Sequence, residues 1–238
     1  MLFNQCTFKS THNSYVGGLV GSIARQLSSG VRCLELDIHP EGEFPLGHLA
    51  PGDSVALGGE NPPTLALSAW LHAITDWCTA AKHHAPVTVF LDLKQCIGVD
   101  QHLPWNEERF ERLNSLLLST CSHLVMRRDL KDWPDVRDLR SRMLIVISGD
   151  FYTRRLAAGA LADSCFVEQQ PGEPETAAML ASGASTSASW LAREMGTGKA
   201  TRLWNFTLRD AFVGLPTFPA TDTPFEDWYT QSLTNAQT

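Results

Sequence analysis

Two short stretches near the amino end carry side chains that could act on a phosphodiester. One contains His12-Asn13, and the other ends in Glu35-Leu36-Asp37. Histidine moves protons near neutral pH, and carboxylate and amide oxygens bind hard cations. Residues i and i+2 of a strand lie on the same face, so Glu35 and Asp37 can share one ion. This combination predicts metal-assisted phosphodiester chemistry.

Three further residues extend this set of candidates. Asp92 ends an apolar run at 86–92 and would add another oxygen ligand. Lys94 lies two residues later on the same side, where it could contact a phosphate oxygen. His48 follows a short extended stretch, and a second histidine across the site would give an acid opposite a base. We therefore expect His12 and His48 to be catalytic, and Asn13, Glu35, Asp37 and Asp92 to hold the metal.

Arg202 and Trp204 form a second group, near a late strand. Being two residues apart, they share a face and could supply a cation and an aromatic wall for a head group. The alternatives are a surface charge for Arg202 and core packing for Trp204. With Lys94, they are the expected substrate-binding residues.

Simpler explanations exist for the carboxylates as well, because Glu35 and Asp37 could be a salt-bridged pair at a strand end. Two carboxylates on one face repel each other unless a cation lies between them, which favours a metal site. Oxygen-rich ligands favour Ca²⁺, with Mg²⁺ as the alternative, over zinc. The six cysteines are scattered without a CxxC pair, which also argues against zinc.

The elements that must position these residues alternate along the chain. Apolar, β-rich runs predict strands, and 3.6-residue periodicity predicts helices. We expect strands at 6–10, 32–38, 86–92, 142–148, 165–168, 201–206 and 218–221, and helices at 21–29, 65–83, 106–118 and 177–194. This order predicts an α/β fold, a TIM-like (β/α) barrel that is complete or else irregular and incompletely closed. No linker divides the chain, so residues 1–238 form one expected catalytic domain.

Composition and charge limit the classes of partner that the protein could bind. The chain has 238 residues, of which 43% are hydrophobic, and a net charge of -7 without a basic tract. Nucleic acid is therefore excluded as a partner, because phosphate backbones require clustered lysine and arginine. No apolar run is long enough for a transmembrane segment, and the amino end is too polar for a signal peptide. We expect a monomer that is secreted if a leader has been removed and cytoplasmic otherwise.

The motifs resemble the X region of phosphatidylinositol-specific phospholipase C. Its first block is similar to residues 11–15, its second to residues 30–37, and the spacing to His48 also matches. The strand at 86–92 resembles the one that carries the last acidic ligand. Arg202-Leu203-Trp204 looks like an Arg-x-Tyr pair that contacts inositol, and residues 220–222 are similar to the end of bacterial secreted members.

The resemblance implies a mechanism. The inositol 2-hydroxyl attacks phosphorus, giving a cyclic inositol phosphate and diacylglycerol, with Ca²⁺ on Asn13, Glu35, Asp37 and Asp92. His48 would protonate the departing glycerol oxygen, while His12 would stabilise the phosphorane or assist deprotonation. The metal-independent branch has an arginine where this chain has His39. Val146 and Ser148 stand where signalling members carry lysines, which favours an unphosphorylated or glycosylated phosphatidylinositol.

Two alternatives stay open. Sphingomyelinase D-like and glycerophosphodiester phosphodiesterase enzymes also combine two histidines with a Glu-x-Asp pair on a similar barrel. The stretch at 91–94 and the late Arg-x-Trp resemble the sphingomyelinase group, but that relationship does not explain Thr-His-Asn-Ser-Tyr at 11–15. The His-Arg-Gly start of glycerophosphodiesterases is absent. The third hypothesis is a non-catalytic barrel that binds lipid or metal.

Overall fold

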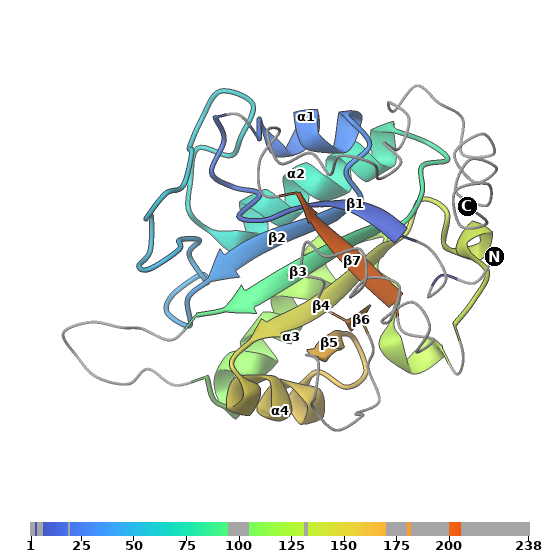
Figure 1. Cartoon of the computed structure of the whole chain (residues 1–238). Helices are drawn as coiled ribbons and strands as arrows, with labels where there is room; N and C mark the ends of the chain where they lie inside the picture. Colours follow the sequence, from blue (N-terminus) through green and yellow to red (C-terminus); the bar gives the residue numbers. More distant parts are fainter. Residues whose placement is uncertain are drawn as a thin grey trace.

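Strands and helices alternate along the chain as far as Gln169 (Figure 1), and, apart from one helix and one strand that were not expected, the elements fall within a few residues of the expected ranges. The computed structural model describes residues 3, 7–18, 20–94, 105–130, 133–169, 180–181 and 200–205. In chain order the elements are β1 (Thr7–Thr11), α1 (Ile23–Ser28), β2 (Cys33–Ile38), α2 (Leu67–Ala80), β3 (Val87–Leu93), α3 (Glu107–Thr120), β4 (Met143–Gly149), α4 (Phe151–Ala160), β5 (Phe166–Gln169), β6 (Leu180–Ala181) and β7 (Ala200–Asn205).

The strands pair in parallel, in sequence order, and β7 pairs back with β1, so the sheet closes into a barrel. The longest registers join β2 to β3 and β3 to β4, whereas β1 and β2 share a single register pair, Ser10 with Cys33. The carboxyl ends of β2, β3 and β4 point the same way, toward the long loops at the left of Figure 1. The expected TIM-like (β/α) barrel is confirmed.

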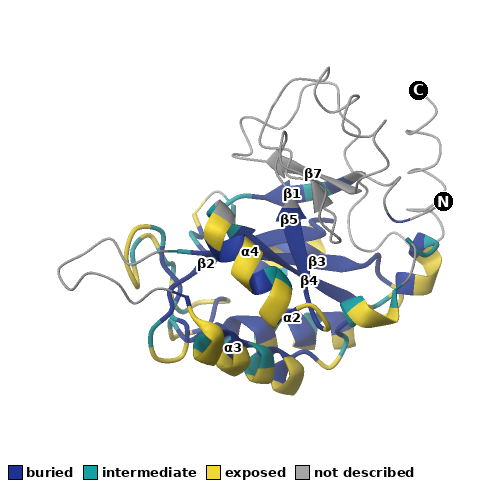
Figure 2. Cartoon of the chain, turned by 90° about the horizontal axis from the view of Figure 1, so that it is seen from below, coloured by how far each residue is buried: buried dark blue, intermediate teal, exposed yellow. Residues whose placement is uncertain are grey.

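Two apolar clusters lie on the two sides of the barrel wall. Inside the barrel, alternate residues of the strands pack together, as Phe8, Phe90 and Phe166 do. The residues between them point outward and pack against the helices, as Leu91 and Ile147 do. Strands buried on both faces need near-continuous apolar runs, which is why the sequence predicts β3 and β4. Figure 2 shows the helices turning exposed faces away from this buried sheet.

Local signals account for the helix ends. Asn106 caps α3, its side chain accepting a hydrogen bond from the Arg109 amide at 3.0 Å, as its position before the helix predicted. Gly30 has a φ of 85°, in the left-handed region, and ends the turn after α1. The buried Arg32 guanidinium then donates to the Leu27 carbonyl at 2.8 Å, satisfying an acceptor in the last turn of α1.

Several expectations need correction or lie outside the described residues. Leu180–Ala181 is the strand β6, whereas the sequence predicts a helix at 177–194; the rest of that segment is outside the described part of the chain. The strand expected at 218–221 is outside it too. Helix α4 was not expected; it begins at Phe151 and is capped by Asp150, whose side chain accepts from the amides of Tyr152 and Thr153. Among the described residues, no helix is both long and apolar enough to cross a membrane.

The packing of α3 gives a direct test of this arrangement. Leu113 is fully buried in the outer cluster, whereas Leu118 of the same helix is 49% exposed. We expect Leu113→Ala to lower the free energy of unfolding by about 2–5 kcal/mol, because it leaves a cavity between helix and sheet. Leu118→Ala should change it by less than about 0.5 kcal/mol. Urea unfolding of both variants measures the difference, and equal effects would contradict the packing of this helix.

Candidate active site

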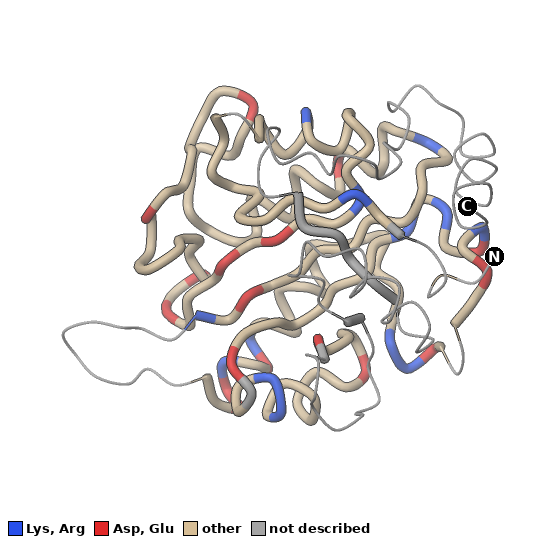
Figure 3. Tube along the Cα trace, viewed as in Figure 1, with Lys and Arg blue, Asp and Glu red and all other residues tan. Residues whose placement is uncertain are grey.

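Residues from separate segments meet at the carboxyl ends of the first strands. Asp37 of β2 is the register partner of Asp92 of β3. His12 and Asn13 follow β1, and His48 lies in the loop after β2. In parallel barrels these strand ends carry the functional side chains. Figure 3 shows acidic positions on the neighbouring strands β2 and β3.

Three carboxylates form the centre of the site. Glu35, Asp37 and Asp92 each offer an oxygen, and these oxygens lie within 4.8 Å of one another. The Asp37 side chain is only 1% exposed. Burial raises the pKa of Asp37, and the negative charge of Asp92 raises it further, while Lys94, His48 and Tyr15 lower it. The cluster therefore carries a charge that its neighbours offset only in part.

Lys94 supplies positive charge from within the protein. Its Nζ lies 3.1 Å from Asp37 Oδ2 and 2.5 Å from Asp92 Oδ2. Burial acts to lower the pKa of Lys94, but the adjacent Asp92 and Asp37 outweigh it, and the net pKa is raised. The ammonium group is therefore charged and contacts two of the three carboxylates.

The two histidines each pair with a different carboxylate. His12 Nε2 lies 3.5 Å from Glu35 Oε2, and His48 Nδ1 lies 3.0 Å from Asp37 Oδ2. Their side chains are 36% and 40% exposed, so both combine a buried partner with access to solvent. In His48 the carboxylate of Asp37 binds Nδ1, which orients the ring and leaves Nε2 as the nitrogen that can exchange a proton with a substrate.

The position of Asn13 depends on an unusual backbone conformation. Asn13 has a φ of 47°, and its backbone amide donates to Glu35 Oε2 at 3.0 Å. The Tyr15 hydroxyl donates to Asp37 Oδ2 at 2.8 Å and lies 3.3 Å from Asn13 Oδ1. Burial, followed by the charge of Asp37, raises the pKa of Tyr15, so it remains a neutral donor. The Tyr15 hydroxyl thus lies between the side-chain oxygen of Asn13 and the carboxylate of Asp37.

The sequence motifs predict no role for Tyr15 or for Gln26. Gln26 fixes the loop after β1. The Gln26 side chain donates to the Ser14 carbonyl at 2.7 Å and accepts from the Thr11 hydroxyl at 2.6 Å. The Ser14 hydroxyl in turn accepts from the Glu35 amide at 2.8 Å. A buried glutamine on the apolar face of an amphipathic helix is the one sequence signal that could have indicated this network.

The loop that carries His48 is fixed by Gly47 and His39. The Gly47 amide donates to the Asp37 carbonyl at 3.1 Å, and a Cβ at Gly47 would meet the Ala50 carbonyl oxygen at 1.9 Å, so only glycine fits. His39, which is fully buried, lies with Nε2 2.9 Å from the Gly47 carbonyl oxygen. His39 therefore supports the loop before His48.

The donor set fits a hard divalent cation. Asp37 Oδ1 is buried, and within the described residues it has no hydrogen-bond partner. A buried carboxylate oxygen without a donor is costly unless a cation satisfies it. Three carboxylates and the Lys94 ammonium leave two negative charges, which one Ca²⁺ or Mg²⁺ would balance. The cluster could therefore bind a metal, as its residue types predicted.

Arg202 and Trp204 lie on β7, beside β1. Arg202 is in register with Phe8, and Trp204 with Ser10. The backbone thus places both at the closing seam of the barrel, while their side chains lie outside the described part of the structure.

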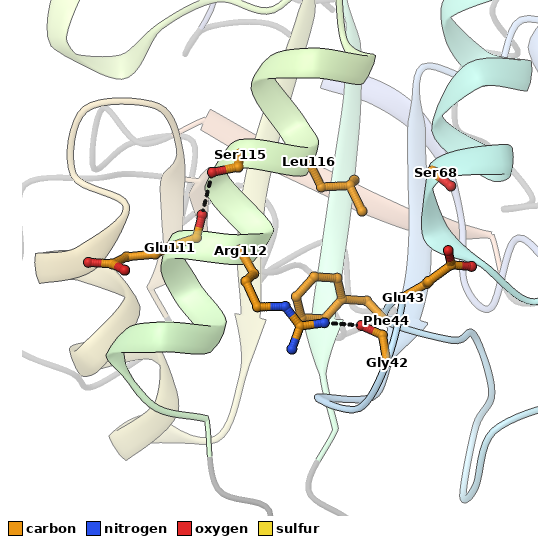
Figure 4. A pocket seen from close by; sticks show the side chains of 8 residues that line it. All are labelled: Gly42, Glu43, Phe44, Ser68, Glu111, Arg112, Ser115 and Leu116. Carbon is orange, nitrogen blue, oxygen red and sulfur yellow. Dashed lines mark hydrogen bonds between the residues drawn. The ribbon is translucent and has the colours of Figure 1, made fainter.

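A separate, open cavity of about 420 Å³ lies between α3 and the loop after β2 (Figure 4). The guanidinium of Arg112 packs over the Phe44 ring, 5.5 Å from its centroid, and donates to the Gly42 carbonyl. None of the expected site residues lines this cavity. The candidate active site is therefore the group at the strand ends.

Comparison with known proteins gives a result at the level of the fold. No family model and no curated protein matches the sequence. Among solved structures, a calcium-dependent phosphoinositol-specific phospholipase C from Pseudomonas sp. is similar, with a TM-score of 0.64 at 18% identity, over 86% of this chain and 84% of that one. Its myoinositol complex has a TM-score of 0.65 at 19% identity, over 86% and 83% of the two chains.

A calcium-dependent phosphatidylinositol-specific phospholipase C from Streptomyces antibioticus is also similar. Its TM-score is 0.62 at 17% identity, over 84% of this chain and 82% of that one. The resemblance seen in the sequence motifs is thus confirmed for the fold. This chain has the fold of the bacterial calcium-dependent, phosphoinositol-specific phospholipases C.

Proposed function

We propose that this protein is a calcium-dependent phosphodiesterase that cleaves phosphatidylinositol to a cyclic inositol phosphate and diacylglycerol. One observation carries the proposal. Two histidines contact two different members of a carboxylate cluster, Glu35 and Asp37, and one buried oxygen of that cluster, Asp37 Oδ1, has no hydrogen-bond donor among the described residues. The fold shared with two phospholipases C that are described as calcium-dependent supports it.

Each group has a part in the reaction. Asn13, Glu35, Asp37 and Asp92 would hold Ca²⁺, which when bound supplies positive charge at the phosphate and lowers the pKa of the attacking hydroxyl. Lys94, adjacent to two of these carboxylates, would add a positive charge beside a phosphate oxygen.

The histidines would move the protons. As the bond from the inositol 2-oxygen to phosphorus forms, the hydroxyl proton passes to a base. His12, which lies beside Glu35, would act as this base or assist the proton transfer. As the bond from phosphorus to the glycerol oxygen breaks, His48 would protonate that oxygen from Nε2, while Asp37 holds Nδ1 and stabilises the charged ring. Arg202 and Trp204 would bind the head group.

The reaction itself is tested by phosphorus NMR of the products from phosphatidylinositol vesicles, with calcium and with a chelator. We expect a cyclic inositol phosphate that forms only with calcium. Parallel samples of sphingomyelin, lysolipid and glycerophosphodiesters provide the comparison. Turnover confined to these substrates would replace the proposal with one of the related phosphodiesterases, and turnover of none would indicate a non-catalytic barrel.

The histidines are tested by His12→Gln and His48→Gln. Each should lower kcat/KM by about 10²–10⁴, the usual contribution of a positioned acid or base. His72→Gln is the matched control, because His72 is exposed on α2, and its rate should not change. Calcium binding, measured by calorimetry, should survive all three changes. Rates within a few-fold of wild type for His12→Gln and His48→Gln would rule out their catalytic roles.

Metal binding is tested by Asp92→Asn, with Asp76→Asn on the exposed face of α2 as control. Replacing a charged ligand by a neutral amide should weaken calcium binding at least about ten-fold, because charge count largely sets the affinity of such sites. Isothermal titration calorimetry measures both variants. An unchanged dissociation constant for Asp92→Asn would remove Asp92 from the ligand set.

A further inference from the structure

Trp105, just before α3, is joined to Lys94 of the candidate site by a hydrogen bond. The indole Nε1 of Trp105 donates to the Lys94 carbonyl oxygen at 3.1 Å. The Lys94 amide donates to the Ile38 carbonyl oxygen at 2.9 Å, at the end of β2. The backbone of Lys94 is therefore held on both sides, by β2 through its amide and by Trp105 through its carbonyl group.

A stack of buried aromatic rings holds the indole of Trp105 in place. Its ring stacks on Phe44, with centroids 5.7 Å apart and planes 8° apart, and on Phe110 of α3, with centroids 5.5 Å apart. The Arg112 guanidinium packs over the Phe44 ring and donates to the Gly42 carbonyl (Figure 4). Because close-packed rings keep a single rotamer, the loop after β2 and helix α3 together fix the direction of the indole N–H.

The backbone of Lys94 matters because its side chain does not direct itself. The ammonium group of a lysine sits on a flexible stem that adopts many rotamers. Its Nζ nevertheless contacts both Asp37 and Asp92. A fixed backbone reduces the conformational entropy that is lost when the ammonium group is held between two carboxylates.

The ammonium group of Lys94 and a metal ion would share the same ligands. Two of the three carboxylates of the cluster already contact Nζ. The ammonium charge repels a second cation at these carboxylates and so lowers their affinity for it. The same charge would stabilise a phosphate oxygen of the substrate. The placement of Lys94 therefore acts in opposite directions on calcium affinity and on the rate.

We propose that Trp105 is a positioning residue of the active site, which holds Lys94 against Asp37 and Asp92 through the Lys94 carbonyl group. In this position the ammonium group limits the affinity of the cluster for calcium and remains beside the phosphate of the substrate. This inference rests on the proposed function, because it assigns a positioning residue to that reaction.

The test uses Trp105→Phe, which keeps a ring in the stack but removes the indole N–H, alone and combined with Lys94→Met. Lys94→Met should tighten calcium binding about ten-fold and lower kcat/KM for phosphatidylinositol about 10²-fold, because it removes the ammonium charge. Trp105→Phe should act in the same directions, by about three-fold and about ten-fold, since one hydrogen bond is lost. Added to Lys94→Met, it should change neither quantity further, because its effect passes through Lys94.

Calcium binding is measured by isothermal titration calorimetry, and turnover is measured on phosphatidylinositol vesicles. Trp77→Phe is the matched control, because the Trp77 indole Nε1 also donates a hydrogen bond, to the Ser28 hydroxyl at 3.2 Å. Trp77 packs against His84, which precedes the amino end of β3, whereas the candidate site lies at the carboxyl ends of the strands. Trp77→Phe should leave calcium affinity and turnover unchanged.

The outcomes are distinguishable. If Trp105→Phe leaves calcium affinity unchanged or weakens it, or if its effects add fully to those of Lys94→Met, Trp105 is merely structural. The inference is then overturned, while turnover by the wild-type enzyme upholds the proposed function. If the wild-type protein binds calcium but turns over no lipid, the proposed function fails, and non-additive effects on calcium affinity still support the positioning of Lys94. If it binds no calcium, both fail.

Discussion

Repulsion between buried carboxylates is the constraint on which the rest of this structure depends. The register of β2 with β3 sets Asp37 beside Asp92, and Glu35 lies close to both. Three neighbours, Tyr15, His48 and Lys94, all contact the same oxygen, Asp37 Oδ2. The other oxygen, Oδ1, has no such donor in the described part of the chain. The protein offsets the charge from one side and leaves the other side to a cation.

The barrel supports this arrangement because the two faces of its wall have different surroundings. An apolar cluster that includes Phe8, Phe90 and Phe166 fills the barrel interior next to the charged groups, so that their electrostatic interactions act in an environment of low polarity. Outside, the helices bury the alternate residues and hold the strands in register. Buried polar side chains then set the loops: Gln26 fixes the turn after β1, and His39 supports the turn before His48. The functional loops are therefore anchored by buried hydrogen bonds.

The strand ends around the barrel mouth carry two different groups of polar side chains. On β2 and β3 the carboxylates lie next to a lysine and two histidines, a set suited to a cation and to proton transfer. On β4 and β5 the Ser148 hydroxyl donates to the buried Glu168 carboxylate. Strand pairing places these groups side by side, because Asp37, Asp92 and Ser148 are register partners on β2, β3 and β4, and β5 pairs next to β4.

The sequence by itself determined most of the elements, because apolar periodicity and capping residues act locally; Asn106 begins one helix and Gly30 follows the end of another, as expected. It also identified the carboxylates, since residues two apart on a strand must share a face. It missed α4 and assigned 180–181 to a helix. Only the tertiary structure decided the contacts of Tyr15, Gln26 and Glu168, whose partners come from other elements and are set by strand register. Such partners leave no local pattern, because their contacts form only when the barrel closes.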